Sequence, residues 1–149
     1  MPVVSDSAAR QAANMDRKTS LLPPGIAPPF GAYSHGIAVP ASGQLLVTSG
    51  QLGLGADGVC PPDVAGQAAI CLAAIHAILV EAGATRADVL RLNAYVTRRD
   101  DFPAYMAARD AWLADVAVKP ASTLMIVGGF TRPEFLVEIE AIACVPAAR

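Results

Sequence analysis

Side chains that could carry acid–base or anion-binding chemistry are few in this sequence, and most lie in its second half. Glu138 and Glu140 are two residues apart in the segment VEIEAIA, and the hydroxyls of Ser122 and Thr123 open the apolar run STLMIVGG. A carboxylate can orient a water molecule and carry its proton during hydrolysis. From the residues alone, the alternative is that Glu138 and Glu140 share the solvated face of a strand whose intervening residues are buried.

Arg109 is the cation whose position needs an explanation. It falls within the apolar stripe of a helix predicted from about Phe102 to Val116, not opposite that stripe. One hypothesis is that Arg109 or Arg132 supplies positive charge for an anionic ligand. The alternative is that Arg109 lays its aliphatic stem over apolar neighbours and pairs with a carboxylate at the rim.

The histidines and cysteines give weaker signals. No partner can be identified for His35 or His76, so we interpret the first as a surface or interface residue and the second as structural. Cys60, Cys71 and Cys144 are odd in number, far apart and without CxxC spacing, which predicts neither a disulfide framework nor a metal site. Free thiols are typical of a reducing compartment, and we expect a cytoplasmic protein.

Length and composition limit the kind of fold that can hold these side chains and the partners that the protein can have. The 149 residues fit one domain, and 54% of them are hydrophobic while 16% are charged. Because charged residues usually make up about 25%, some of the apolar surplus is expected to cover a subunit interface. The net charge is −2 without any basic run, so we expect no nucleic-acid partner and no membrane partner. The longest apolar stretch, residues 68–80, is shorter than the ~20 residues of a membrane span.

The chain divides into two unequal parts. Residues 1–22, mostly small and polar, are predicted to form a flexible N-terminal extension, and residues 23–149 a single domain. Within the domain, Asp63 and Gly83 bound the most secure helix. A polar face comprising Asp63, Gln67 and Glu81 is expected along that helix.

The strands are expected from β-rich segments. GIAVP and QLLVTSGQL are predicted to form a hairpin through residues 41–43. In residues 88–97 the alternation predicts a core face formed by Leu90, Leu92, Ala94 and Val96. With STLMIVGGF and EFLVEIEAIAC near the C-terminus, the order predicts an α+β domain. Its two helices would pack on one face of a mixed six-stranded sheet.

Several of these segments, in collinear order, resemble the Rid (reactive intermediate deaminase) family, also called the YjgF or L-PSP endoribonuclease family. They are PFGAYSHGI, LLVTSGQLG, ILVEAGATRADVLRLNAYVTRRDDF and VEIEAIA, and they cover most of residues 26–145. The resemblance implies a chorismate-mutase-like fold and a homotrimer with ligand clefts between subunits. It also implies hydrolysis of enamines or imines to carbonyl compounds and ammonia, with no metal or organic cofactor.

The resemblance also implies site residues. Glu138 matches the acidic residue that positions the attacking water, Tyr33 matches a tyrosine that caps the ligand from a neighbouring chain, and Ser49 matches the serine of the SGQ turn. From the residues alone, Tyr33 could equally be a packing residue and Ser49 an ordinary turn residue. Glu140 is assigned to the solvated face.

Three positions depart from the deaminating branch of the family. Ser122 stands where an arginine grips the substrate carboxylate, Met106 where an asparagine is often found, and Leu124 where a cysteine often sits. A serine hydroxyl can donate one hydrogen bond but cannot neutralise a charge. Arg109, one helical turn beyond Met106, is therefore the candidate for a displaced cation.

Two functions follow as hypotheses. The first is a small-molecule hydrolase in which Glu138 orients water, and the alternative is a non-catalytic metabolite-binding or regulatory trimer of the same fold. RNA cleavage, which one family name suggests, has little support from a chain with an acidic balance and no basic or aromatic groove.

Overall fold

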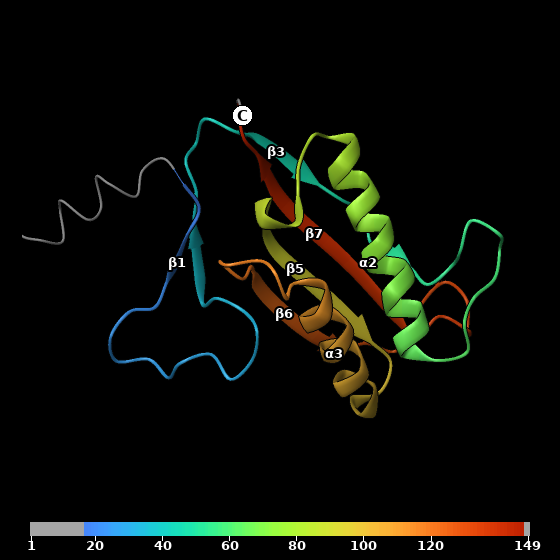
Figure 1. Ribbon diagram of the computed structural model, residues 1–149. Coiled ribbons are helices and arrows are strands. Elements are labelled where there is room, and N and C mark those ends of the chain that lie inside the picture. Colours follow the sequence, from blue (N-terminus) through green and yellow to red (C-terminus); the bar gives the residue numbers. More distant parts are fainter. Residues whose placement is uncertain (1–16, 148–149) are drawn as a thin grey trace, which may run out of the picture.

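The computed structural model describes residues 17–147, in which two α-helices cover one face of a five-stranded mixed sheet (Figure 1). The strand order is β3-β7-β5-β6, and β4 also pairs with β7. β5 and β6 are parallel, whereas every pairing to β7 is antiparallel. The α+β class is confirmed. The strands of this sheet are β3 (Gln44–Val47), β4 (Gln51–Leu52), β5 (Val89–Val96), β6 (Ala121–Ile126) and β7 (Val137–Val145).

Strand β7 shows how the sequence pattern produces a one-sided sheet. Its residues alternate without exception between buried and partly exposed positions, starting with buried Val137. The buried set faces the helices, while Glu138 and Glu140 belong to the opposite set, because successive side chains of a strand project to opposite faces. The sheet therefore has one face covered by helices and one without a cover among the described residues.

The predicted core face of β5 is correct except at its start. Leu92, Ala94 and Val96 are fully buried, but Val89 takes the buried position expected for Leu90. The register between β5 and β7 shifts between residues 89 and 91, so one residue is out of the alternation. At such an irregularity one residue drops out of the alternation, so the residues on one side of it project to the face opposite to the one that the simple alternation predicts.

Helix α2 (Val64–Glu81) begins and ends where its local signals predict. The Asp63 carboxylate accepts a hydrogen bond of 2.8 Å from the backbone N–H of Gly66. Gly83, with φ of 75°, ends the helix because that left-handed conformation favours glycine. By length and composition α2 could span a membrane, but its buried residues, Cys71 and Ile75 among them, belong to the core that the helix shares with β7.

The expected polar face of α2 is wrong at Gln67. This side chain is fully buried, and its Nε2 donates hydrogen bonds of 2.8 Å to the carbonyls of Pro61 and Glu134. Its Oε1 accepts a hydrogen bond of 2.8 Å from the N–H of Leu136. Gln67 is buried because it satisfies three backbone groups of the loops that flank α2 and β7.

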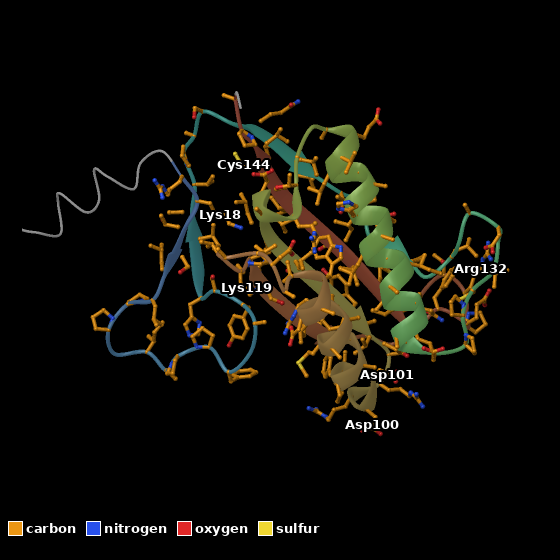
Figure 2. All side chains as sticks on the ribbon, viewed as in Figure 1. Lys18, Asp100, Asp101, Lys119, Arg132 and Cys144 are labelled. Atoms are coloured by element: carbon orange, nitrogen blue, oxygen red, sulfur yellow. The ribbon has the colours of Figure 1, made fainter. Side chains whose placement is uncertain are left out.

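Helix α3 (Phe102–Trp112) is shorter than the predicted 102–116. Leu113 already leaves the helical conformation, and Lys119 donates a hydrogen bond of 2.5 Å to the carbonyl of Leu113. Asp101 occupies the N-cap position but makes no capping hydrogen bond, because its carboxylate pairs with Arg98 at 3.1 Å. Figure 2 shows Asp100 and Asp101 at the beginning of α3.

The strand count and the first hairpin differ from the prediction. β2 (Gly36–Ala38) pairs with β1 (Thr19–Leu21) in a separate two-stranded ribbon, so the main sheet has five strands instead of six. The expected hairpin between GIAVP and QLLVTSGQL is therefore wrong. The second segment is also divided into β3 and β4, at the point where Thr48 exchanges two hydrogen bonds with Ala141, one of them through its hydroxyl.

The ribbon also bears on the predicted N-terminal extension. Residues 1–16 lie outside the described residues, but β1 lies within the 1–22 segment and is paired throughout. Lys18 connects the ribbon to the sheet, because its side chain donates a hydrogen bond of 2.8 Å to the Val89 carbonyl. Burial lowers the pKa of Lys18 to about 8, against the opposing effect of the Asp88 charge.

Candidate functional site

A pocket of about 230 Å³ lies between α3, the start of β6 and the loop that precedes β2. It brings together most of the site residues predicted from sequence. Its lining consists of Phe30, Gly31, Tyr33, Met106, Arg109, Ser122 and Leu124. Ser49 and Glu138 are not part of it.

Two regular elements supply four of these side chains. Met106 and Arg109 are three residues apart on α3, so they lie on the same side of the helix. Ser122 and Leu124 on β6 pair with buried residues of β5, which places them on the face of the sheet that the helices cover. The pocket is thus built where α3 meets β6.

The loop that carries Tyr33 is held against the start of β6 by Ser34. The Ser34 N–H donates to the Pro120 carbonyl at 3.0 Å, and its hydroxyl donates to the Lys119 carbonyl at 2.5 Å. The family resemblance had implied that Tyr33 reaches the cleft from a neighbouring chain. Within the chain, Tyr33 lines this pocket, because Ser34 fixes its loop there, and a role toward a neighbouring chain stays a prediction.

Phe30 completes the aromatic edge of the pocket and was not identified from sequence. Its ring meets Tyr33 edge-on at 5.7 Å between centroids, and Phe30 is 94% exposed. Its only sequence signal was its place in the segment PFGAY. A phenylalanine this exposed is a place where a ligand or second chain can bury apolar surface.

Arg109 has the contacts expected under both alternatives, because it pairs with a carboxylate and also lines the pocket. It is 2% exposed, and its Nε donates a hydrogen bond of 2.9 Å to the half-exposed carboxylate of Asp110, as the structural interpretation expected of a rim carboxylate. It also lines the pocket, and its guanidinium carbon lies 5.8 Å from the centre of the Tyr105 ring. Burial raises the pKa of Tyr105 to about 12, although the Arg109 charge opposes this.

Ser122 presents an unsatisfied hydroxyl to this pocket. Its Oγ is buried and has no hydrogen-bond partner among the described residues. The hydroxyl of Tyr105 is also buried without a hydrogen-bond partner among the described residues. Buried polar groups are nearly always paired, so an unpaired hydroxyl that lines a pocket suits a ligand atom.

Glu138 lies on the other face of the sheet. In β7 it pairs with Tyr95 of β5 and Leu52 of β4, and no described residue donates a hydrogen bond to its carboxylate. The carboxylate rests against Gly50, where the carbon of any side chain would overlap it. Burial, and then the charge of Glu140, raise the pKa of Glu138 above its ordinary value.

The neighbours of Glu138 differ from it in their bonding. Glu140 accepts hydrogen bonds from the Tyr95 hydroxyl at 2.8 Å and from Asn93 Nδ2 at 3.1 Å, so it is held in a polar network. Ser49 lies in the turn before Gly50, and its carbonyl accepts a hydrogen bond of 3.1 Å from Gln51. Glu138 is the carboxylate of this face that remains available to bind water and exchange a proton.

Arg132, the other candidate cation, does not line the pocket. It lies 3.7 Å from Glu134 in an ion pair and stacks over Phe135 at 5.5 Å. Figure 2 shows Arg132 on the opposite side of α2 from Lys119, the residue next to the pocket loop. Within residues 17–147, no group of three histidine, cysteine or acidic side chains could hold a metal ion.

Comparisons with known proteins extend these observations. Residues 25–145 match the model of the family described as Endoribonuclease L-PSP. The chain is 31% identical to the 2-iminobutanoate/2-iminopropanoate deaminase of Escherichia coli K12 over 116 residues, which cover 76% of this chain and 88% of that protein.

Solved structures agree with this similarity. A Yersinia pestis protein of the conserved Rid family has a TM-score of 0.77 and 32% identity, covering 87% of this chain and 99% of its own. Escherichia coli TdcF with bound serine has a TM-score of 0.64 and 27% identity, covering 82% of this chain and 91% of its own.

Proposed function

Because this chain belongs to the Endoribonuclease L-PSP family, also known as the Rid or YjgF family, we propose that it hydrolyses small imines or enamines. The reaction would take place in clefts between the subunits of a homotrimer. A curated relative is named for deaminating 2-iminobutanoate and 2-iminopropanoate. We also propose a cytoplasmic location, which three free cysteines support.

The observation that carries the proposal is the Glu138 carboxylate, which is unpaired among the described residues and has a raised pKa. In the proposed reaction, water adds to the carbon of the C=N bond while Glu138 takes a proton from that water. That proton is delivered to nitrogen, which gives a carbinolamine. The remaining hydroxyl proton then moves to nitrogen through Glu138, the C–N bond breaks, and ammonia and a carbonyl compound leave. A raised pKa makes the carboxylate a stronger base toward the attacking water and brings its pKa closer to neutral pH, where one group can accept a proton and then pass it on.

The division of the site between two faces supports a cleft shared by chains. The pocket lies on the helix-covered face, whereas Glu138 lies on the other face of the same sheet. That other face also carries Leu45 and Val47, which are 68% and 65% exposed. A second copy that covers these residues could bring its Glu138 to the pocket of the first.

The test of hydrolysis is ammonia release from freshly generated 2-iminopropanoate and from a neutral imine, comparing the wild type with Glu138→Gln. We expect turnover of at least one substrate and a loss of about 10²- to 10⁴-fold in the variant. The absence of turnover on both would support the alternative, a metabolite-binding trimer without catalysis. The departures at Met106, Ser122 and Leu124 are what keep that alternative open.

A second experiment tests the shared cleft. Glu138→Gln and Met106→Trp, whose indole would fill the pocket, are each expected to be inactive alone. If each site combines Glu138 of one chain with the pocket of another, co-expression of the two chains should restore about a quarter of the sites. No restoration, or a single species with the mass of a monomer, would contradict the proposal.

A further inference from the structure

We propose that Arg109 is the anion-binding residue of the pocket and that, together with the Ser122 hydroxyl, it holds the carboxylate of a small organic acid. The positive charge would come from helix α3 instead of strand β6. The inference rests on the proposed function only in identifying that acid as a 2-imino acid or its 2-oxo acid product.

The first step is the bonding state of the guanidinium. An arginine has five N–H donors, and here Nε and Nη2 both face a single oxygen, Oδ1 of Asp110, at 2.9 Å. Among the described residues, no other ion pair involves Arg109. The guanidinium also lies against Tyr105, so the donors that face neither Asp110 nor Tyr105 are the ones available on the side of the pocket that Arg109 lines.

The second step is the hydroxyl across the pocket. Ser122 Oγ is buried in this lining without a hydrogen-bond partner among residues 17–147. A carboxylate offers two oxygens, so it can accept from a guanidinium and a hydroxyl at once. This arrangement gives the unpaired hydroxyl a partner and gives the buried cation a second counter-charge.

The third step is the surroundings of the charge. Arg109 is the one charged residue in the lining, and Phe30, Met106 and Leu124 make much of the remaining wall apolar. An apolar wall strengthens the attraction between a guanidinium and an anion because it excludes water. Asp110 is about half exposed, so solvent screens its compensating charge more than it screens that of Arg109.

The size of the pocket restricts the ligand. A volume of about 230 Å³ lies below the range of drug-sized sites, which starts near 300 Å³. The chemistry therefore selects a monocarboxylate with a short apolar chain. If the proposed hydrolysis is correct, pyruvate and 2-oxobutanoate are stable ligands with which binding can be measured without turnover.

The experiment measures binding of pyruvate and of its neutral counterpart, pyruvamide, by titration calorimetry. We expect the wild type to prefer pyruvate, and Arg109→Gln to weaken pyruvate binding by about 10- to 100-fold while leaving pyruvamide unchanged. Arg132→Gln is the matched control and should bind as the wild type does, since Arg132 does not line the pocket. Adding Ser122→Arg to Arg109→Gln should restore the preference for the acid.

A measurement on the wild type covers the case in which Arg109→Gln does not fold. The side-chain Nε–H resonance of Arg109, identified by its loss in Arg109→Lys, should shift during a pyruvate titration. Equal affinity for pyruvate and pyruvamide, or an unmoved Arg109 resonance, would overturn the inference.

The two proposals fail in different ways. Arg109-dependent binding of pyruvate without ammonia release from any imine would refute the hydrolysis and uphold the anion site. Turnover of a neutral imine without preference for the acid would do the opposite.

Discussion

Oδ1 of Asp110 lies 2.9 Å from both Nε and Nη2 of Arg109, the residue that precedes it. A half-exposed carboxylate therefore holds one edge of a buried guanidinium. The backbone of α3 connects the two residues directly, so the pair needs no tertiary contact to form. The tertiary structure decides which surface the other edge of the guanidinium meets, and that surface is the pocket.

Asp110→Asn should strengthen the binding of a carboxylate ligand. Removing this negative charge leaves Arg109 less compensated, and screened ion pairs of this kind are worth about 0.2–1 kcal/mol, so we expect an affinity gain of about 1.4-fold to fivefold for pyruvate. Titration calorimetry measures the change. Asp115→Asn, an exposed aspartate paired with Arg86, is the control. Unchanged or weaker pyruvate binding in Asp110→Asn would contradict this reasoning.

The pH dependence of turnover should report Glu138. Because its pKa is raised by burial and by Glu140, the carboxyl loses its proton at a higher pH than an ordinary glutamate. Activity that requires the carboxylate should therefore fall, as pH decreases, at a pH above the usual glutamate range. Glu140→Gln removes a neighbouring negative charge, so the acidic fall in activity should move to lower pH. If activity falls at the same pH in Glu140→Gln as in the wild type, this would argue against Glu138 as the titrating group.

Gly50→Ala should reduce activity without unfolding the protein. A methyl group at this position would overlap the end of the Glu138 side chain, which is flexible and can move away. The expected result is a displaced carboxylate, a loss of turnover and a nearly unchanged melting temperature. Gly128→Ala is a matched control because no atom lies within 4 Å of the added carbon. Full activity in Gly50→Ala would show that the position of this carboxylate does not matter.

Gln67→Leu should destabilise the fold by about 2–4 kcal/mol, because it leaves buried backbone groups at Pro61, Glu134 and Leu136 without their partner. Urea unfolding monitored by circular dichroism provides the measurement. Gln51→Leu, which loses one local hydrogen bond to Ser49, should cost much less. Equal effects of the two substitutions would mean that the Gln67 bonds contribute little.

The three thiols should differ in reactivity. Burial raises the pKa of Cys71 to about 12, so this thiol is neither ionised nor accessible near pH 8. Cys60 and Cys144 are partly exposed. Labelling with a thiol-specific disulfide reagent should therefore modify Cys60 in the folded protein and Cys71 only after denaturation, while Cys144, which pairs with Leu45, should react slowly if a second copy covers that face. Equal labelling rates for all three in the native state would be inconsistent with this burial.

Much of the fold was predictable because its signals are local. Asp63 and Gly83 bound α2 through their own backbone conformations and hydrogen bonds. In β7, the alternation of side chains between the two faces of the strand was enough to predict which residues are buried. The types of residue available for chemistry, such as the serine at position 122, could likewise be read directly.

Other features depend on which distant segments meet, and a local pattern contains no information on that. β2 could have paired with β3 or β1, and only the assembled ribbon shows that β1 is its partner. Gln67 has the polarity of a surface residue, yet it is buried because two loops bring their unpaired backbone groups to it. Likewise, contact between α3, β6 and the loop of Tyr33 puts Arg109 in a pocket, while strand register leaves Glu138 on the other side of the sheet.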